Sequence, residues 1–164
     1  MEALDGRVKE SCGAAVLDGA ESVYVLRVPT RKIRKIALGE GARLPAYCTS
    51  LGRVLLAGMP DDDALRRLAA APLDAHTRHT VTDPAALLAK VQQARRQGWA
   101  QVNQELEEGL VSIAAPITNR GGRVVAALNV SGQANRTSAR QMQEKMLPPL
   151  LDAAQALSRL LGQA

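Results

Sequence analysis

The sequence predicts an α+β fold built on a mainly antiparallel sheet. Segments that favour strands occur as two adjacent pairs, residues 13–17 with 22–28 and residues 110–118 with 124–131, each joined by a short turn sequence. Helical patterns lie between the pairs and after the second pair, whereas a doubly wound parallel sheet would need strict alternation of strand and helix. With 164 residues, 46% of them hydrophobic, the chain is long enough for one domain with a buried core.

The first strand pair lies near the N-terminus. Asp18 and Gly19 separate its two apolar runs, and an Asp-Gly dipeptide in that position is a strong signal for a hairpin turn. The second run is rich in β-branched and aromatic residues, which favour strands. Residues 33–38 are expected to form a further strand, because a short apolar run there ends at a glycine-rich break.

Three helices are predicted between the strand pairs, the first starting near residue 50. The second follows Pro60 and has an acidic first turn, which the helix dipole favours. The third begins at an Asp-Pro sequence, at residues 83–84, and ends at Gly98, since glycine readily adopts the left-handed conformation that closes a helix. Residues 99–106 are then expected to form a strand.

The C-terminal part of the chain is predicted to be helical. Ser138 and Gln141 have the spacing of a capping box, in which each side chain bonds to the backbone of the other residue. Apolar residues then recur with helical spacing up to Leu161. Pro148 and Pro149 interrupt this pattern, so the helix must either kink there or divide in two.

Residues 41–59 form the segment most suggestive of a binding site. Pro45 favours an extended approach, and either Thr49 or Ser50 can cap a helix that continues through Leu51. The first N–H groups of a helix have no partner within it and lie at the positive end of its dipole. Because small side chains leave these groups uncovered, the helix start can hold a carboxylate or phosphate. An ordinary capped helix without a ligand is the alternative.

Three small polar residues lie within otherwise apolar strands, namely Ser112, Asn129 and Ser131. Asn129 and Ser131 are separated by one residue and therefore point to the same face of their strand. A buried hydroxyl or amide needs a hydrogen-bond partner. These side chains therefore either bond to neighbouring backbone or converge on a small polar ligand.

Few residues have the pattern expected for catalysis. Cys48 could be a nucleophile if the helix start beside it lowered the pKa of its thiol. Glu105 and Glu107 fall on one strand face, where a solvated rim is a simpler interpretation than an acid–base pair. His76 and His79 lack the spacing and the nearby Glu that are typical of zinc sites, so we expect a surface loop and no metal. No nucleotide-binding motif is present, and no cofactor is expected.

The composition argues against several other functional classes. Aromatic residues make up 2% of the chain and none is Phe, which argues against a base-stacking surface for RNA or single strands. The net charge of +5 is scattered, except for a basic concentration at residues 31–35 that we interpret first as a solvated loop and second as a surface facing DNA or another domain. The charged first residues and the lack of a long apolar run predict a cytoplasmic protein with reduced cysteines and no membrane contact.

Four segments along nearly the whole chain resemble one protein family. They are LPAYCTSLGRVLLAGMP, TDPAALLAKVQQARRQGWA, QELEEGLVSIAAPI and GRVVAALNVSGQANR, in that order. Together they resemble the effector-binding domain of IclR-type bacterial transcriptional regulators. The similarity is closest to the branch that regulates aromatic-acid and β-ketoadipate pathways.

The resemblance implies a GAF-like fold, in which helices flank an antiparallel sheet. It also implies a homodimer or homotetramer that responds to a small organic acid, the effector. Residues 1–10 would be the end of a linker helix and residues 11–164 the effector-binding domain. DNA would be bound only through an N-terminal winged helix-turn-helix that is missing from this chain.

The resemblance further implies an effector site, in which the amides of Ser50 and Leu51 would meet the carboxylate. Some members that sense glyoxylate or pyruvate have an acidic residue in place of Val102 and a serine in place of Asn129. We therefore expect a larger effector with an apolar or aromatic body. The expected effector-binding residues are Ile36, Leu44, Thr49, Ser50, Leu51, Val102, Leu110, Ser112, Asn129 and Ser131.

Two other functions stay open on the sequence alone. One is a small cytosolic enzyme that uses Cys48 or a carboxylate pair. The other is an oligomerisation module that binds no ligand. Direct DNA binding by this chain is the least expected function, because no recognition helix is apparent.

Overall fold

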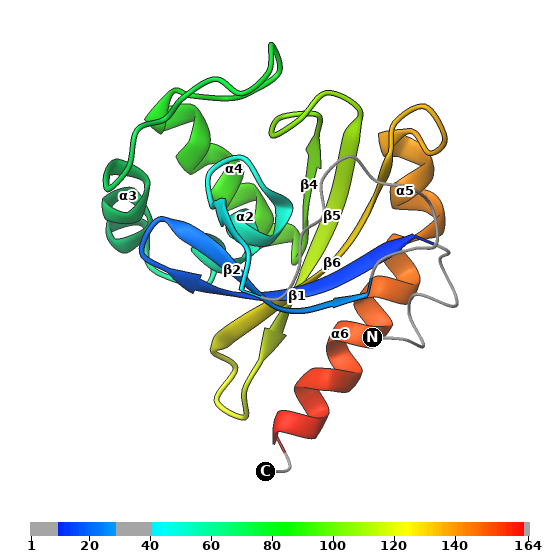
Figure 1. Ribbon diagram of the computed structural model, residues 1–164. Coiled ribbons are helices and arrows are strands. Elements are labelled where there is room, and N and C mark those ends of the chain that lie inside the picture. The colour runs from blue at the N-terminus through cyan, green and yellow to red at the C-terminus, as the bar shows by residue number, and fades with distance from the viewer. Residues whose placement is uncertain (1–9, 29–40, 163–164) are drawn as a thin grey trace.

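The computed structural model of the protein describes residues 10–28 and 41–162. Within them, six strands form one antiparallel sheet in the order β3-β2-β1-β6-β5-β4 (Figure 1). The strands are β1 (Ser11–Asp18), β2 (Glu21–Val28), β3 (Arg43–Pro45), β4 (Ala100–Asn103), β5 (Leu110–Thr118) and β6 (Val124–Gln133). The helices are α2 (Ser50–Ala57), α3 (Asp61–Ala69), α4 (Pro84–Gln97), α5 (Ala139–Lys145) and α6 (Leu147–Gly162). The predicted α+β fold with an antiparallel sheet is confirmed.

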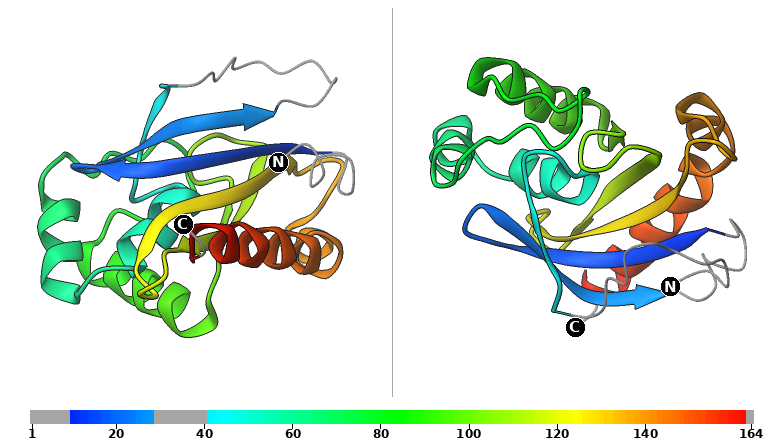
Figure 2. Two further views of the ribbon diagram at one scale, coloured as in Figure 1. Left: turned by 90° about the horizontal axis from the view of Figure 1, so that it is seen from below. Right: turned by 45° about the horizontal axis from the view of Figure 1, so that its top comes forward.

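Helices cover both faces of the sheet. Helices α2, α3 and α4 lie on one side, and α5 and α6 lie on the other (Figure 1 and Figure 2). Because successive residues of a strand point to opposite faces, β5 directs Val111 and Ile113 toward α6 but Ser112 and Ala114 toward α2. This alternation places the small polar residues of β5 and β6 between the sheet and α2.

Local capping interactions set the starts of α2, α4 and α5 and the end of α4, and they confirm the predicted positions. Thr49 is the N-cap of α2, and its Oγ1 accepts a hydrogen bond from Gly52 N at 3.2 Å. Asp83 caps α4, which ends at Gly98 with φ 84°. Both halves of the capping box that begins at Ser138 are present.

Two strands differ from the prediction, and the structure decides between the two alternatives for the last helix. The extended approach that Pro45 favours is a strand, β3, which the sequence did not predict, because Arg43–Pro45 pairs with the start of β2. Strand β4 ends at Asn103 rather than at residue 106, because Gln104 adopts a left-handed φ of 61°. The last helical pattern divides in two, with Pro148 and Pro149 in the first turn of α6, where missing amide hydrogens cost little.

Some predictions fall outside the described residues. They are the strand over residues 33–38, the basic segment at residues 31–35, the site residue Ile36, and residues 1–9 of the expected linker helix.

Candidate functional site

A hollow lies on the α2 face of the sheet, beside the start of that helix. Its cavity volume is about 40 Å³, and it is partly open to solvent. Every predicted effector-binding residue that the structure describes lines this hollow: Leu44, Thr49, Ser50, Leu51, Val102, Leu110, Ser112, Asn129 and Ser131. The structure thus brings together residues from three separate stretches of the chain, 44–51, 102–112 and 129–131, and their role in effector binding stays a prediction.

The start of α2 forms one wall of the hollow. The first intrahelical hydrogen bond runs from Arg53 N to Thr49 O at 3.1 Å. The amides of Ser50 and Leu51 precede that bond and lie at the positive end of the helix dipole. Ser50 Oγ is buried and has no hydrogen-bond partner in the described part of the chain.

Asn129 on β6 contributes a second unpartnered atom. Its Nδ2 donates to Ser131 Oγ at 3.2 Å and to Tyr24 Oη at 3.4 Å. Its Oδ1 is buried and, among residues 10–28 and 41–162, has no hydrogen-bond partner. An unpaired buried polar atom costs about 1–3 kcal/mol, so such an atom in a native fold often marks the place of a missing water, ion or ligand. The alternative without a ligand required neighbouring backbone groups to bond to the Asn129 side chain. Its Oδ1 has no such bond.

Arg27 reaches the hollow because of an irregularity in β2. Tyr24 and Leu26 are paired with two adjacent residues of β1, so the intervening Val25 forms a bulge. The extra residue shifts the alternation by one, and Arg27 therefore points to the same face as Tyr24. The Arg27 guanidinium lies over the Tyr24 ring, 5.2 Å from its centre, and donates to Tyr24 Oη at 3.4 Å.

Sequence reasoning assigned no binding role to four residues of the wall: Tyr24, Arg27, Cys48 and Leu106. Strict alternation along β2 would place Arg27 opposite Tyr24, and nothing in the sequence marks the bulge. The only sign in the sequence that Arg27 has a special role is that it is a cation in a mostly apolar strand. Leu106 was expected within a strand, whereas it lies in the turn after β4.

Cys48 lacks the exposed, easily ionised thiol that a nucleophile needs. Its side chain is fully buried. Burial and the nearby Glu105 carboxylate raise the pKa of the Cys48 thiol to about 12, although the Arg53 charge acts in the other direction. The expected lowering of the pKa is therefore wrong, because burial outweighs the groups that favour the thiolate. The thiol is neutral near pH 7 and does not support an enzyme.

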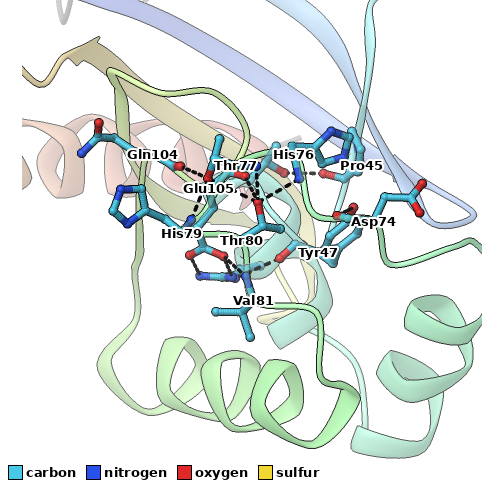
Figure 3. Close-up of polar contacts among 12 residues, drawn as sticks. Pro45, Tyr47, Asp74, His76, Thr77, His79, Thr80, Val81, Gln104 and Glu105 are labelled. Carbon is cyan, nitrogen blue, oxygen red and sulfur yellow. Dashed lines mark hydrogen bonds and ion pairs between the residues drawn. The ribbon is translucent and has the colours of Figure 1, made fainter.

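Glu105 is not part of a solvated rim, because it is 7% exposed and forms a buried ion pair with Arg53. Its carboxylate oxygens lie 2.6 and 2.9 Å from the two terminal nitrogens of Arg53. The amide of Val81 also donates to Glu105 Oε1 at 3.2 Å, as Figure 3 shows. The expected strand ended three residues too late, and Gln104 turns the chain so that Glu105 points inward.

The histidine-containing loop lies outside the hollow. The ring of His76 stacks on Tyr47 at 6.1 Å, and His79 Nε2 lies 3.9 Å from a Glu108 oxygen. In the part of the chain that the structure describes, no group of three potential metal ligands occurs. None of the described helices is both long and apolar enough to cross a membrane.

A family of known proteins matches this chain along almost its whole length. The family described as "Bacterial transcriptional regulator IclR C-terminal" matches residues 1–159. The Pca regulon regulatory protein of Pseudomonas putida is 42% identical over 162 residues, which are 98% of this chain and 56% of that protein. The chain spans about half the length of the curated relatives it matches. These relatives are transcriptional regulators and not enzymes.

Solved structures share the fold. A transcriptional regulator from Rhodococcus sp. RHA1 matches with a TM-score of 0.94 and 41% identity, over 99% of this chain and 65% of that one. The inducer-binding domain of PobR from Acinetobacter, a double mutant in complex with 3-hydroxybenzoic acid, matches with a TM-score of 0.88 and 31% identity, over 96% of this chain and 93% of that one. The chain therefore belongs to the C-terminal domain family of IclR-type bacterial transcriptional regulators.

Proposed function

We propose that this chain is the effector-binding domain of a transcriptional regulator and that the hollow binds a small organic acid. The observation that carries the proposal is the pair of buried, unpartnered atoms Ser50 Oγ and Asn129 Oδ1, both on residues that line the hollow beside the start of α2. Neighbouring groups satisfy most buried polar atoms in a folded protein. A bound polar ligand accounts for both exceptions at once.

The charges around the hollow favour an anion. Among the described lining residues, Arg27 carries the one formal charge, and it is positive. The amides of Ser50 and Leu51 add the positive end of the α2 dipole. A carboxylate is the simplest anion that both features recognise.

The apolar part of the wall favours an effector with a sizeable nonpolar body. Leu44, Val102 and Leu110 line the hollow together with the ring of Tyr24. The relatives agree with an aromatic acid, because one is named for the Pca regulon and another is solved with 3-hydroxybenzoic acid. We infer an aromatic or dicarboxylic acid rather than a two- or three-carbon oxoacid.

Calorimetry tests the proposal. Protocatechuate, 4-hydroxybenzoate, β-ketoadipate, pyruvate and glyoxylate are titrated into the chain, and at least one of the larger acids is expected to bind. Ser131→Leu should weaken that binding about tenfold or more, because the added side chain fills the hollow and removes a polar contact. Val125→Leu is the control, since Val125 lies on the same strand but is exposed. If no acid in the panel binds, the proposal is wrong.

We further propose how binding affects the complete regulator. The acid favours one arrangement of subunits in a homodimer or homotetramer in the cytoplasm, and thereby alters DNA binding through a separate N-terminal domain. Light scattering on the chain, with and without the acid, measures the assembly. A monomer under both conditions would contradict this part of the proposal.

A further inference from the structure

We propose that the Arg53–Glu105 ion pair is a positioning device for the effector site. Residues 104–110 are named the roof segment. The ion pair fixes the position of the roof segment relative to the start of α2, and both of these segments line the hollow. This inference rests on the proposed function, since it assigns a role in that same site to residues that do not touch the effector.

The roof segment contributes Leu106 and Leu110 to the wall of the hollow. Its ends are closed on each other, because Gln104 N donates to Leu110 O at 2.8 Å and Gly109 N donates to Gln104 Oε1 at 2.9 Å. Gln104 and Gly109 both have left-handed backbone conformations, with φ of 61° and 86°. The segment is thus a compact turn whose position must be set by contacts from outside it.

Arg53 supplies such a contact from α2. Its Nη1 and Nη2 donate to the two carboxylate oxygens of Glu105 at 2.9 and 2.6 Å, so the pair is bidentate. Its Nε donates to Tyr47 O at 3.2 Å, in the segment that leads into the helix. One side chain therefore joins the roof, the helix and the approach to the helix start.

A second set of contacts holds the roof from its other side. Thr80 Oγ1 donates to Glu105 O at 2.5 Å, and Thr77 Oγ1 donates to Gln104 O at 2.6 Å. Val81 N donates to Glu105 Oε1 (Figure 3). Glu105 is thus held between Arg53 and the loop that precedes α4, and the roof has little freedom to shift along α2.

The chemistry of the pair indicates positioning rather than simple stabilisation. The side chains of Arg53 and Glu105 are 3% and 9% exposed, and burying two charges is costly, so apolar residues of similar size would often serve the fold equally well. A bidentate ion pair instead gives a fixed geometry. It also neutralises Arg53 locally, which leaves Arg27 as the cation available to an anionic effector.

The test replaces both charges with apolar side chains, as Arg53→Met combined with Glu105→Leu. Removing both partners avoids leaving one buried charge unpaired, so the chain is expected to fold. Affinities for protocatechuate and 4-hydroxybenzoate, measured by calorimetry, should fall about tenfold or more, because small misplacements of binding groups have large effects. An unchanged affinity in a folded double variant would overturn the proposal.

Arg95→Met is the matched control. Arg95 holds the opposite end of the same helix, since its Nε donates to Ala57 O at 2.9 Å and its Nη2 donates to Met59 O at 2.7 Å. The proposal expects this variant to bind within about twofold of the unmodified chain. An equal loss in both variants would show general loosening of α2 and would also overturn the proposal.

Hydrogen exchange without ligand separates this inference from the proposed function. The double variant should exchange faster at residues 50–53 and 104–110, with the rest of the sheet unchanged. If no acid binds the unmodified chain, the proposed function fails, and the exchange pattern still decides the positioning role. Uniform acceleration across the sheet would contradict it.

Discussion

Cys48 lies just before α2, where the positive end of a helix dipole lowers the pKa of an exposed thiol. Here the thiol is buried, and its pKa is raised to about 12 by burial and by the Glu105 carboxylate. The same loss of solvent acts on Ser50 Oγ and Asn129 Oδ1, which are left without partners in the described part of the chain. Burial therefore makes the thiol of Cys48 inert and leaves Ser50 Oγ and Asn129 Oδ1 without partners in the described part of the chain, where we propose that a ligand binds.

The raised pKa of Cys48 predicts a pH-dependent stability. Because the folded thiol titrates about three units above its ordinary value of 9.0, its contribution is complete below pH 9 and is lost as the pH rises toward 12. Urea unfolding should therefore show a larger stability difference between the unmodified chain and Cys48→Ala at pH 7 than at pH 10. Cys12 is present in both chains, so its titration cancels. If the stability difference between the two chains were larger at pH 10 than at pH 7, the pKa of Cys48 would not be raised in the folded state.

At the scale of single elements, α2 is fixed at both ends by groups outside the helix. Thr49 Oγ1 donates to Pro45 O at 2.9 Å, and Arg95 binds carbonyl oxygens at the C-terminal end. The backbone of Ala46 passes so close to Gly52 that a Cβ there would lie 2.2 Å from Ala46 O. The absence of a side chain at Gly52 thus lets the approach segment fold against the helix start.

Gly52→Ala should consequently be severe for a small substitution. The neighbouring group is backbone and cannot turn away, so we expect a loss of roughly 3 kcal/mol in the free energy of unfolding. Effector binding should also weaken, because the Ser50 and Leu51 amides move with the helix start. Gly121→Ala is the control, since the nearest atom to its Cβ is 3.5 Å away. Similar urea midpoints for the two variants would show that the close approach is unimportant.

At the scale of the whole molecule, the sheet separates the core beneath α6 from the hollow beside α2. Its α6 face is an apolar core that includes Val111, Ile113, Leu128 and Leu150. Its α2 face contains the hollow and its polar residues. The two faces belong to the same strands, so the core beneath α6 and the proposed binding site use alternate residues of one backbone.

Leu150 tests this separation. Leu150→Ala should cost about 3 kcal/mol of unfolding free energy, because the side chain is fully buried between α6 and the sheet. The folded variant should keep its affinity for the acid, since the hollow lies on the other face. Leu160→Ala, at a position 63% exposed, should change stability by less than about 0.5 kcal/mol. A large loss of affinity in Leu150→Ala would show that the faces are coupled.

Interactions between near neighbours could be predicted well from the sequence. The cap at Thr49, the helix end at Gly98 and the capping box at Ser138 each depend on residues within one turn of each other. The alternation that places Asn129 and Ser131 on one face is equally local. For the last helix the sequence predicts either a kink or a division, because its proline pair is compatible with both outcomes.

Departures from regular pairing could not be predicted. The bulge at Val25, which turns Arg27 toward the hollow, depends on how β2 pairs with β1 and has no clear mark in the sequence. The left-handed Gln104 was equally unmarked, and it made the interpretation of Glu105 wrong. In both places a single backbone irregularity reverses the side-chain direction that strict alternation predicts.

The sequence by itself determined most of the described elements, the family, and the residues that meet at the start of α2, because these follow from short-range patterns and shared motifs. The tertiary structure alone decided which polar atoms are buried without partners, and that Arg53 joins Glu105 across 52 positions of the chain. Burial and long-range pairing depend on how distant segments pack. No local pattern of residues specifies that packing, and it sets both the charge and the shape of the hollow.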